Sequence, residues 1–178
     1  ILRGLLGYRV LLIRKQQQAD FAAVQSWEEL RRFRLGFGSQ WADLALLQYN
    51  SFHVVATPQY ESLFGMLARG RFDAFPRGLN EAWLELSERQ TEFPDLIVEP
   101  TLALNYPWPV YFFVRQGNQP LAERLQRGLM KAEADGSMQK LFMQHHSHLL
   151  QQANLAERRL FQLVNPALPP GTPKSDTS

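Results

Sequence analysis

The sequence contains no cysteine among its 178 residues, which excludes disulfide bonds, thiolate metal sites and cysteine nucleophiles. It has no apolar run close to the roughly 20 residues that a membrane-spanning helix needs. A Walker motif of the form GxxxxGK[ST] is also missing, which argues against nucleotide binding. What remains, 45% hydrophobic and 20% charged residues, is the composition of an ordinary globular protein with one large domain or two small ones.

The sequence also has little excess of either sign of charge. The 19 basic and 17 acidic residues give a net charge of +2, and the two kinds are mixed along the chain. A nucleic-acid-binding surface needs a basic patch or stripe, so we expect no nucleic-acid partner. We find no paired carboxylates, nucleophile elbow or metal motif, so we expect a protein that is not an enzyme and holds no cofactor.

Apolar runs and turn residues alternate through most of the chain. A β-type run at 8–15 is followed by a strand, a glycine turn and a helix across 33–50. Further strands are predicted at 52–57, 71–75 and 95–100, with helices between them. This order with short connections predicts a parallel α/β sheet.

The last third of the chain has a different character. An aromatic strand is expected at 106–116, followed by helices across 120–136 and 137–152 and one more helix across 153–164. The Pro- and Ser-rich segment 165–178 has no periodicity and predicts a disordered tail.

The first candidate site lies where the strand near residue 36 turns into a helix. Gly38, Ser39 and Gln40 would present backbone N–H groups and a hydroxyl to an anionic group, and Trp41 would wall the pocket. The alternative is a plain turn in which Ser39 only caps the helix.

The second candidate site is Pro76-Arg77-Gly78, at the end of the strand predicted at 71–75. Ligands of open parallel sheets bind outside the carboxyl ends of the strands, so Arg77 is a candidate anion clamp with Gly78 beside it. The alternative is a surface arginine on a loop, with Asn80 and Glu81 capping the next helix.

Three histidines form a weaker candidate. His145 and His148 share a helix face and His146 lies between them, but no carboxylate or fourth ligand follows at helical spacing. We therefore expect a solvated helix end and no metal site.

At this point the sequence resembles a known family. The segments "SWEELRRFRLGFGS" and "GRFDA" resemble the second lobe of bacterial extracellular solute-binding proteins of the amino-acid-binding type (family 3), which have the type II periplasmic binding fold. The likeness covers about residues 5–146 and implies two α/β lobes joined by hinge strands, with lobe 1 incomplete in this chain. It divides the chain into the end of lobe 1 and the first hinge strand (1–15), lobe 2 (16–106), a return crossover with lobe 1 helices (107–164) and the tail.

Two departures from the family bear on the ligand. The first part of lobe 1 is absent, and with it the stretch that usually carries the arginine for the ligand carboxylate. Amino-acid binders also place an acidic residue a few positions after the "Da" pair, and here Gly78 stands at that position beside Arg77. We therefore expect a small polar, anionic solute rather than an ordinary amino acid.

The resemblance implies capture of this solute by closure of two lobes outside the cytoplasm, in a periplasmic, monomeric protein that serves an ABC transporter permease. A ligand-sensing domain of a receptor or regulator with the same fold is one alternative, and a cell-wall hydrolase that carries a binding-type domain is another. No signal peptide is visible, and the apolar start at Ile1 without Met suggests a chain cut from a longer one.

Overall fold

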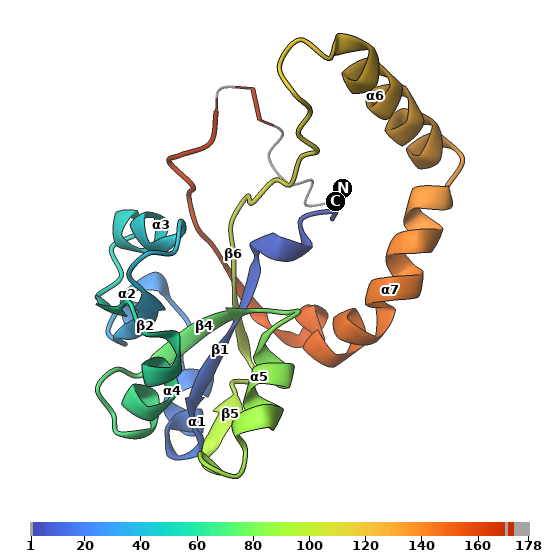
Figure 1. The fold of residues 1–178 in the computed structure, drawn as a ribbon. Coiled ribbons are helices and arrows are strands. Elements are labelled where there is room, and N and C mark those ends of the chain that lie inside the picture. Colours follow the sequence, from blue (N-terminus) through green and yellow to red (C-terminus); the bar gives the residue numbers. More distant parts are fainter. Residues whose placement is uncertain (1, 170, 173–178) are drawn as a thin grey trace.

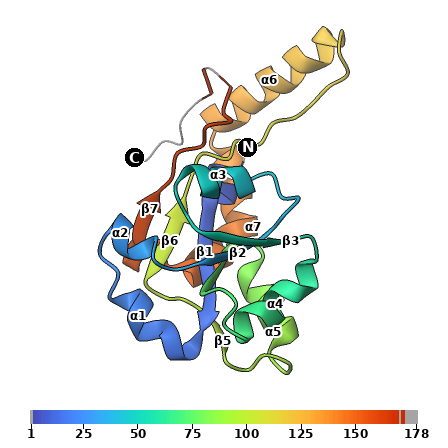
Figure 2. The same ribbon diagram turned by 90° about the vertical axis from the view of Figure 1, so that its left-hand side faces the viewer.

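The computed structural model describes residues 2–169, 171 and 172, and in this range the chain forms one mixed sheet flanked by helices (Figures 1 and 2). The strand order is β3-β2-β4-β1-β6-β7, and β5 pairs with β1 off this path. The strands are β1 (Tyr8–Arg14), β2 (Leu35–Gly38), β3 (Val54–Thr57), β4 (Ala74–Gly78), β5 (Leu96–Val98), β6 (Leu102–Asn105) and β7 (Arg159–Gln162).

Helices cover both faces of this sheet. The α-helices are α1 (Gln18–Ala22), α2 (Trp27–Leu30), α3 (Leu44–Tyr49), α4 (Tyr60–Ala68), α5 (Ala82–Arg89), α6 (Gln119–Ala134) and α7 (Ser137–Ala153). Short 3-10 turns are η1 (Leu5–Gly7), η2 (Lys15–Gln17) and η3 (Leu155–Glu157). The spacing of Ser26 and Glu29, three positions apart in the sequence, predicts a capping box at the start of α2, and the structure contains it: Ser26 Oγ accepts from Glu29 N, and Glu29 Oε2 accepts from Ser26 N.

Strand β1 contributes apolar side chains to both faces of the sheet. Successive side chains of a strand point to opposite faces, so Leu11 and Ile13 join the core with α1, α2 and α3. Val10 and Leu12 join the core with α4 and α5 on the other face. Because both sets are buried, β1 appears in the sequence as a continuous apolar run, and the predicted α/β class is confirmed.

The prediction of an all-parallel sheet is wrong for β1. Strands β2, β3 and β4 are parallel to one another, but β1 runs antiparallel to β4, β5 and β6. Apolar runs show that a strand is buried and carry no information on its direction, so the sequence could not distinguish the two arrangements.

The fourth strand lies three residues beyond its predicted position and includes Pro76, Arg77 and Gly78. Pro76 faces Leu11 of β1, whereas the registered pairing of β4 with β2 is Leu35 with Ala74. Proline lacks an N–H donor, and it lies here where β4 pairs with β1 alone. The junction that the sequence placed in a loop is therefore the second half of a strand.

Asp73 anchors the start of β4. Its carboxylate accepts from Arg34 N at 2.9 Å and Arg34 Nε at 3.1 Å, and Arg14 Nη2 lies 3.3 Å away. Burial acts to raise the pKa of Asp73, but the hydrogen bonds and charge of Arg34 lower it overall. Asp73 is thus an ionised structural anchor, at the opposite end of β4 from Gly78.

Two segments after β6 differ from the sequence prediction. Residues 106–115 form no strand, in keeping with Pro107 and Pro109, which have no N–H to donate. The helix predicted at 153–164 is instead the turn η3 and strand β7, which pairs parallel to β6. Buried Phe161 and Leu163 alternate with exposed Gln162, a period of two that is typical of a strand.

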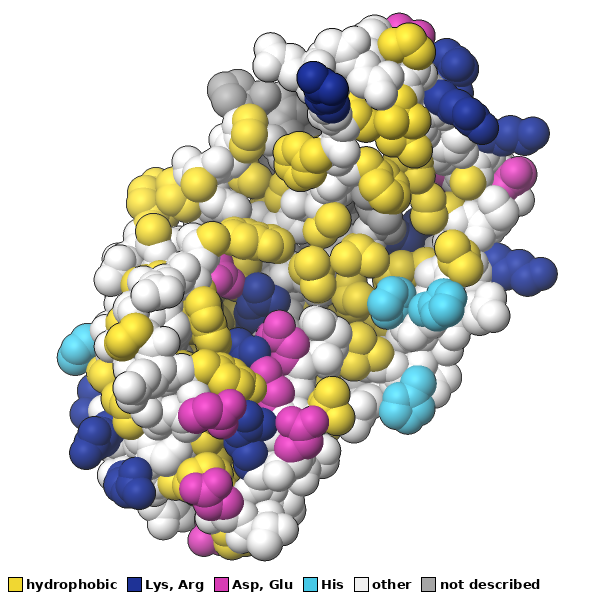
Figure 3. All heavy atoms as spheres, viewed as in Figure 1, with side chains coloured by type: hydrophobic (Ala, Val, Ile, Leu, Met, Phe, Trp, Pro, Cys, Tyr) yellow, Lys and Arg dark blue, Asp and Glu magenta, His cyan; other side chains and the backbone are white. Residues whose placement is uncertain are grey.

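Helices α6 and α7 form an arm that leaves the sheet and returns to it (Figure 1). Apolar side chains remain exposed along the arm and the segment that leads to it, and Phe113 is 91% exposed. Figure 3 shows such side chains gathered on the upper half of this face. Among the described residues, no helix is long and apolar enough to span a bilayer. Half of the predicted tail, residues 170 and 173–178, lies outside the described part of the chain.

Candidate ligand-binding site

Trp41 and Arg77, predicted from separate strand ends, lie against each other. The guanidinium carbon of Arg77 is 4.7 Å from the centre of the Trp41 ring and 5.1 Å from that of Phe75. The ring of Tyr60 from α4 is the third aromatic neighbour, with its centre 5.6 Å from the same carbon. A cation over aromatic faces is held by their quadrupoles, so the two strand ends form one packed cluster.

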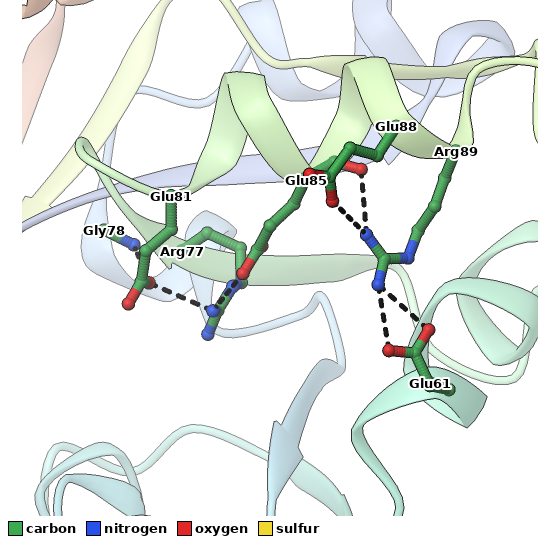
Figure 4. Close-up of polar contacts among 7 residues, drawn as sticks. All are labelled: Glu61, Arg77, Gly78, Glu81, Glu85, Glu88 and Arg89. Carbon is green, nitrogen blue, oxygen red and sulfur yellow. Dashed lines mark hydrogen bonds and ion pairs between the residues drawn. The ribbon is translucent and has the colours of Figure 1, made fainter.

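Arg77 is 8% exposed, and two glutamates of the following segment engage it (Figure 4). Glu85 of α5 accepts from its Nε at 2.7 Å and its Nη2 at 2.5 Å, and Glu81 Oε2 lies 3.1 Å from Nη2. Burial acts to lower the pKa of Arg77, but the two glutamates raise it overall, so the side chain stays charged. The guanidinium already faces two carboxylates, and this geometry does not support an anionic ligand.

Gly78 closes this strand end against Glu81. Its backbone N–H donates to Glu81 Oε2 at 3.0 Å. A Cβ added at Gly78 would lie 3.1 Å from that oxygen and 2.9 Å from Asn80 Oδ1. A carboxylate therefore occupies the space beside the position where the family carries its acidic residue, and Glu81 supplies it from the start of the next helix.

The loop of residues 39–43 joins β2 to α3. Ser39 N donates to Thr57 O at 2.9 Å and Trp41 N donates to Gly38 O at 3.2 Å, so both amides already have acceptors. Helix α3 begins at Leu44 with Asp43 as its N-cap residue, so the alternative in which Ser39 caps this helix is wrong. Residues 40–43 separate Ser39 from the helix, which the glycine pattern did not reveal.

Gly38 is required for the position of Trp41. A Cβ at Gly38 would lie 2.4 Å from the Trp41 ring, closer than real contacts allow. The ring also packs edge-on against Phe37 at 4.8 Å and stacks on Phe75 at 6.1 Å. Ser39 and Gln40 are exposed beside this cluster, so they are accessible from solvent while Trp41 is half-buried.

Asp43 ends the loop, and its carboxylate is buried. Asp43 Oδ2 accepts from Arg9 Nη2 at 3.0 Å and from Tyr106 Oη at 2.6 Å. Burial, together with the charge of Asp43, raises the pKa of Tyr106, which keeps the hydroxyl protonated as a donor. The loop is therefore tied to β1 and to the residue that follows β6.

One groove in the described part of the chain lies away from this cluster. It measures about 470 Å³ and is lined by residues at the end of β1 and before β5, among them Arg14, Lys15 and Asp95. A second groove of about 340 Å³ lies along α4. Neither groove includes Trp41, Arg77 or Gly78.

The structure thus joins Gly38, Trp41, Arg77 and Gly78 in one place, with Ser39 and Gln40 at its exposed rim. Their role in ligand binding stays a prediction. Sequence reasoning missed the aromatic partners and treated Glu81 only as a capping residue. One signal was present, because Arg77, Glu81 and Glu85 follow one another at intervals of four residues.

The three histidines of α7 do not form a metal site with other described residues. His146 packs on the Phe142 ring at 4.9 Å within α7. In the part of the chain that the structure describes, no group of three or more His, Cys, Asp or Glu side chains could hold a metal ion.

Comparison with known proteins gives matches among solved structures. No family model and no curated protein matches the chain. It is similar to an ancestral arginine-binding protein bound to arginine (17% identity, TM-score 0.48) over 77% of this chain and 59% of that one. A mutant of ArgBP from T. maritima matches at 21% identity and TM-score 0.44, over 78% and 57% of the two chains. The ancestral amino acid-binding protein AncCDT-1, a precursor of cyclohexadienyl dehydratase, matches at 15% identity and TM-score 0.45, over 76% and 56%.

These solved structures are amino-acid-binding proteins, the type that the sequence resemblance indicated. The chain spans less than two thirds of the length of each.

Proposed function

We propose that this chain is part of an extracytoplasmic solute-binding protein that captures a small polar solute between two lobes and delivers it to an ABC transporter permease. The solute would lie over residues 39–41 and the end of β4, with Trp41 as its wall. A second lobe would close on it by a hinge motion at the two neighbouring segments that leave the sheet, near residues 7 and 106.

One observation carries this proposal. Trp41 of the loop after β2 and Arg77 of β4, which are 36 positions apart in the sequence, meet in a single aromatic and charged cluster at the edge where the parallel strands end. This edge is where ligands of open α/β sheets bind.

The charges of the cluster favour a solute that carries a positive group. Arg77 supplies one positive charge, whereas Glu81 and Glu85 supply two negative ones. The Glu81 side chain is 39% exposed, which leaves it open to a ligand, and Glu85 is more deeply buried behind it. An ammonium or guanidinium group next to Glu81 would balance the excess negative charge.

Isothermal titration calorimetry tests both parts of the proposal. We expect heat of binding with L-arginine or L-glutamine and none with succinate or inorganic phosphate. Glu81→Gln should weaken binding of the positive compound about tenfold, because a charged hydrogen bond is worth roughly 1.5 to 3 kcal/mol. Ser87→Ala, an exposed position further along α5, is the matched control and should leave affinity unchanged.

Two results would contradict the proposal. Tight binding of succinate or phosphate with no effect of Glu81→Gln would overturn the charge assignment. Absence of binding by every compound, with a folded protein, would argue against solute capture by this chain.

A further inference from the structure

Asp43 is the N-cap residue of α3, but its side chain does not cap the helix. An aspartate at an N-cap commonly accepts a bond from a helix amide, but the Asp43 side chain makes no such bond to α3. Its carboxylate is buried and accepts instead from Arg9 and Tyr106, which lie 34 and 63 positions away in the sequence. The carboxylate of Asp43 therefore makes two hydrogen bonds to residues distant in the sequence and none to its own helix.

Only Tyr106 belongs to a segment through which the chain passes from the sheet to the arm, whereas Arg9 belongs to a strand of the sheet itself. Arg9 lies at the start of β1, and its Nη1 also holds Leu6 O at 2.8 Å. Tyr106 follows β6, and its backbone N donates to Gly7 O at 3.1 Å. The turn before β1 and the segment after β6 are in close contact, because a Cβ added at Gly7 would lie 2.2 Å from Tyr106 O. Figure 1 shows them side by side as they leave the sheet.

The loop, in turn, carries the candidate ligand residues. Asp43 is two positions from Trp41 and four from Ser39 along one short turn. A displacement of the segment after β6 relative to the start of β1 would therefore act on the same carboxylate that ends this loop. Buried, hydrogen-bonded networks of this kind have discrete arrangements rather than a continuous range.

We propose that Asp43 is a positioning residue that locks the loop of residues 39–43 to the start of β1 and to the segment after β6 that leads to the arm, so that the loop and the arm keep one relative orientation. This inference rests on the proposed function for its importance, since the lock would couple solute contact to lobe movement. The lock itself is a property of the chain without ligand.

The absence of cysteine allows a direct test, because two introduced cysteines would be the sole labelling sites. Spin labels at Gln48→Cys on α3 and Gln126→Cys on α6, both exposed, report the distance between the loop's helix and the arm. We expect a single narrow distribution in the otherwise unchanged chain. Asp43→Asn should broaden or shift it by more than about 2 Å, the scale of loop and domain rearrangements. Tyr106→Phe, which removes one hydroxyl, should act in the same direction to a smaller extent.

Asp73→Asn is the matched control, because Asp73 is also a hydrogen-bonded carboxylate paired with arginine but lies at the far end of β4. It should lower the unfolding midpoint without changing the distance distribution. The proposal is overturned if the unchanged chain already shows a broad distribution, or if Asp43→Asn lowers the midpoint as Asp73→Asn does and leaves the distances unchanged. If Asp43→Asn does not fold, Tyr106→Phe decides alone. No ligand is used, so a negative result here is separate from a negative calorimetric result.

Discussion

Replacement of Arg77 by alanine is expected to lower the free energy of unfolding by about 3 to 5 kcal/mol, the usual cost of breaking a buried ion pair. The change would leave Glu85 without its bidentate partner and remove the cation that packs on Trp41, Tyr60 and Phe75. Urea unfolding of the two chains at pH 7, followed by circular dichroism, measures the difference.

Arg127→Ala provides the comparison for this prediction. Arg127 also pairs with a glutamate of its own helix segment, Glu123, but its side chain is 71% exposed. Exposed pairs contribute about 0.2 to 1 kcal/mol, so this variant should remain close to the parent. If Arg77→Ala costs no more than Arg127→Ala, the cluster at the end of β4 is not the buried unit described above.

Phe75→Ala is expected to destabilise the chain by a similar amount, about 3 to 5 kcal/mol, because it removes a large side chain from the core. Phe75 is fully buried in β4 and packs on the rings of Trp41, Phe64 and Phe72. The cavity would lie directly beneath Trp41. We therefore also expect a weaker near-UV circular dichroism signal from tryptophan in the folded variant, beyond the loss of stability.

The contrast for Phe75 is Leu84→Ala on α5, where the leucine is exposed. An exposed substitution usually changes stability by no more than about 0.5 kcal/mol. Equal effects of the two variants would mean that Phe75 does not support the cluster, and an unchanged near-UV signal would separate Trp41 from Phe75.

The features that the sequence predicted well are local. The capping box at Ser26 depends on residues three positions apart, and helices α4, α6 and α7 follow from apolar spacing within each segment. The strand β7 could also have been recognised from the alternation around Phe161. In contrast, the direction of β1 depends on which strand lies beside it, and no pattern inside the segment records that neighbour.

The sequence also predicted only part of the candidate site. Strand-end reasoning identified Trp41 and Arg77, and the structure places them together. It missed that β4 continues through Pro76 to Gly78, so Arg77 lies inside a strand and points at α5 rather than into a loop. The contacts of Asp43 with Arg9 and Tyr106 join three distant parts of the sequence, and only the folded chain brings them together.

The central claim is that a small solute binds at the edge formed by the loop after β2 and the end of β4. It is tested most directly by amide chemical shifts in a nitrogen-15-labelled chain, titrated with the tightest compound of the calorimetric panel. The account predicts that the shifts are largest at Ser39, Gln40, Trp41 and Gly78. Shifts confined to Lys15, Gln16 and Asp95, which line the groove of about 470 Å³, would contradict it.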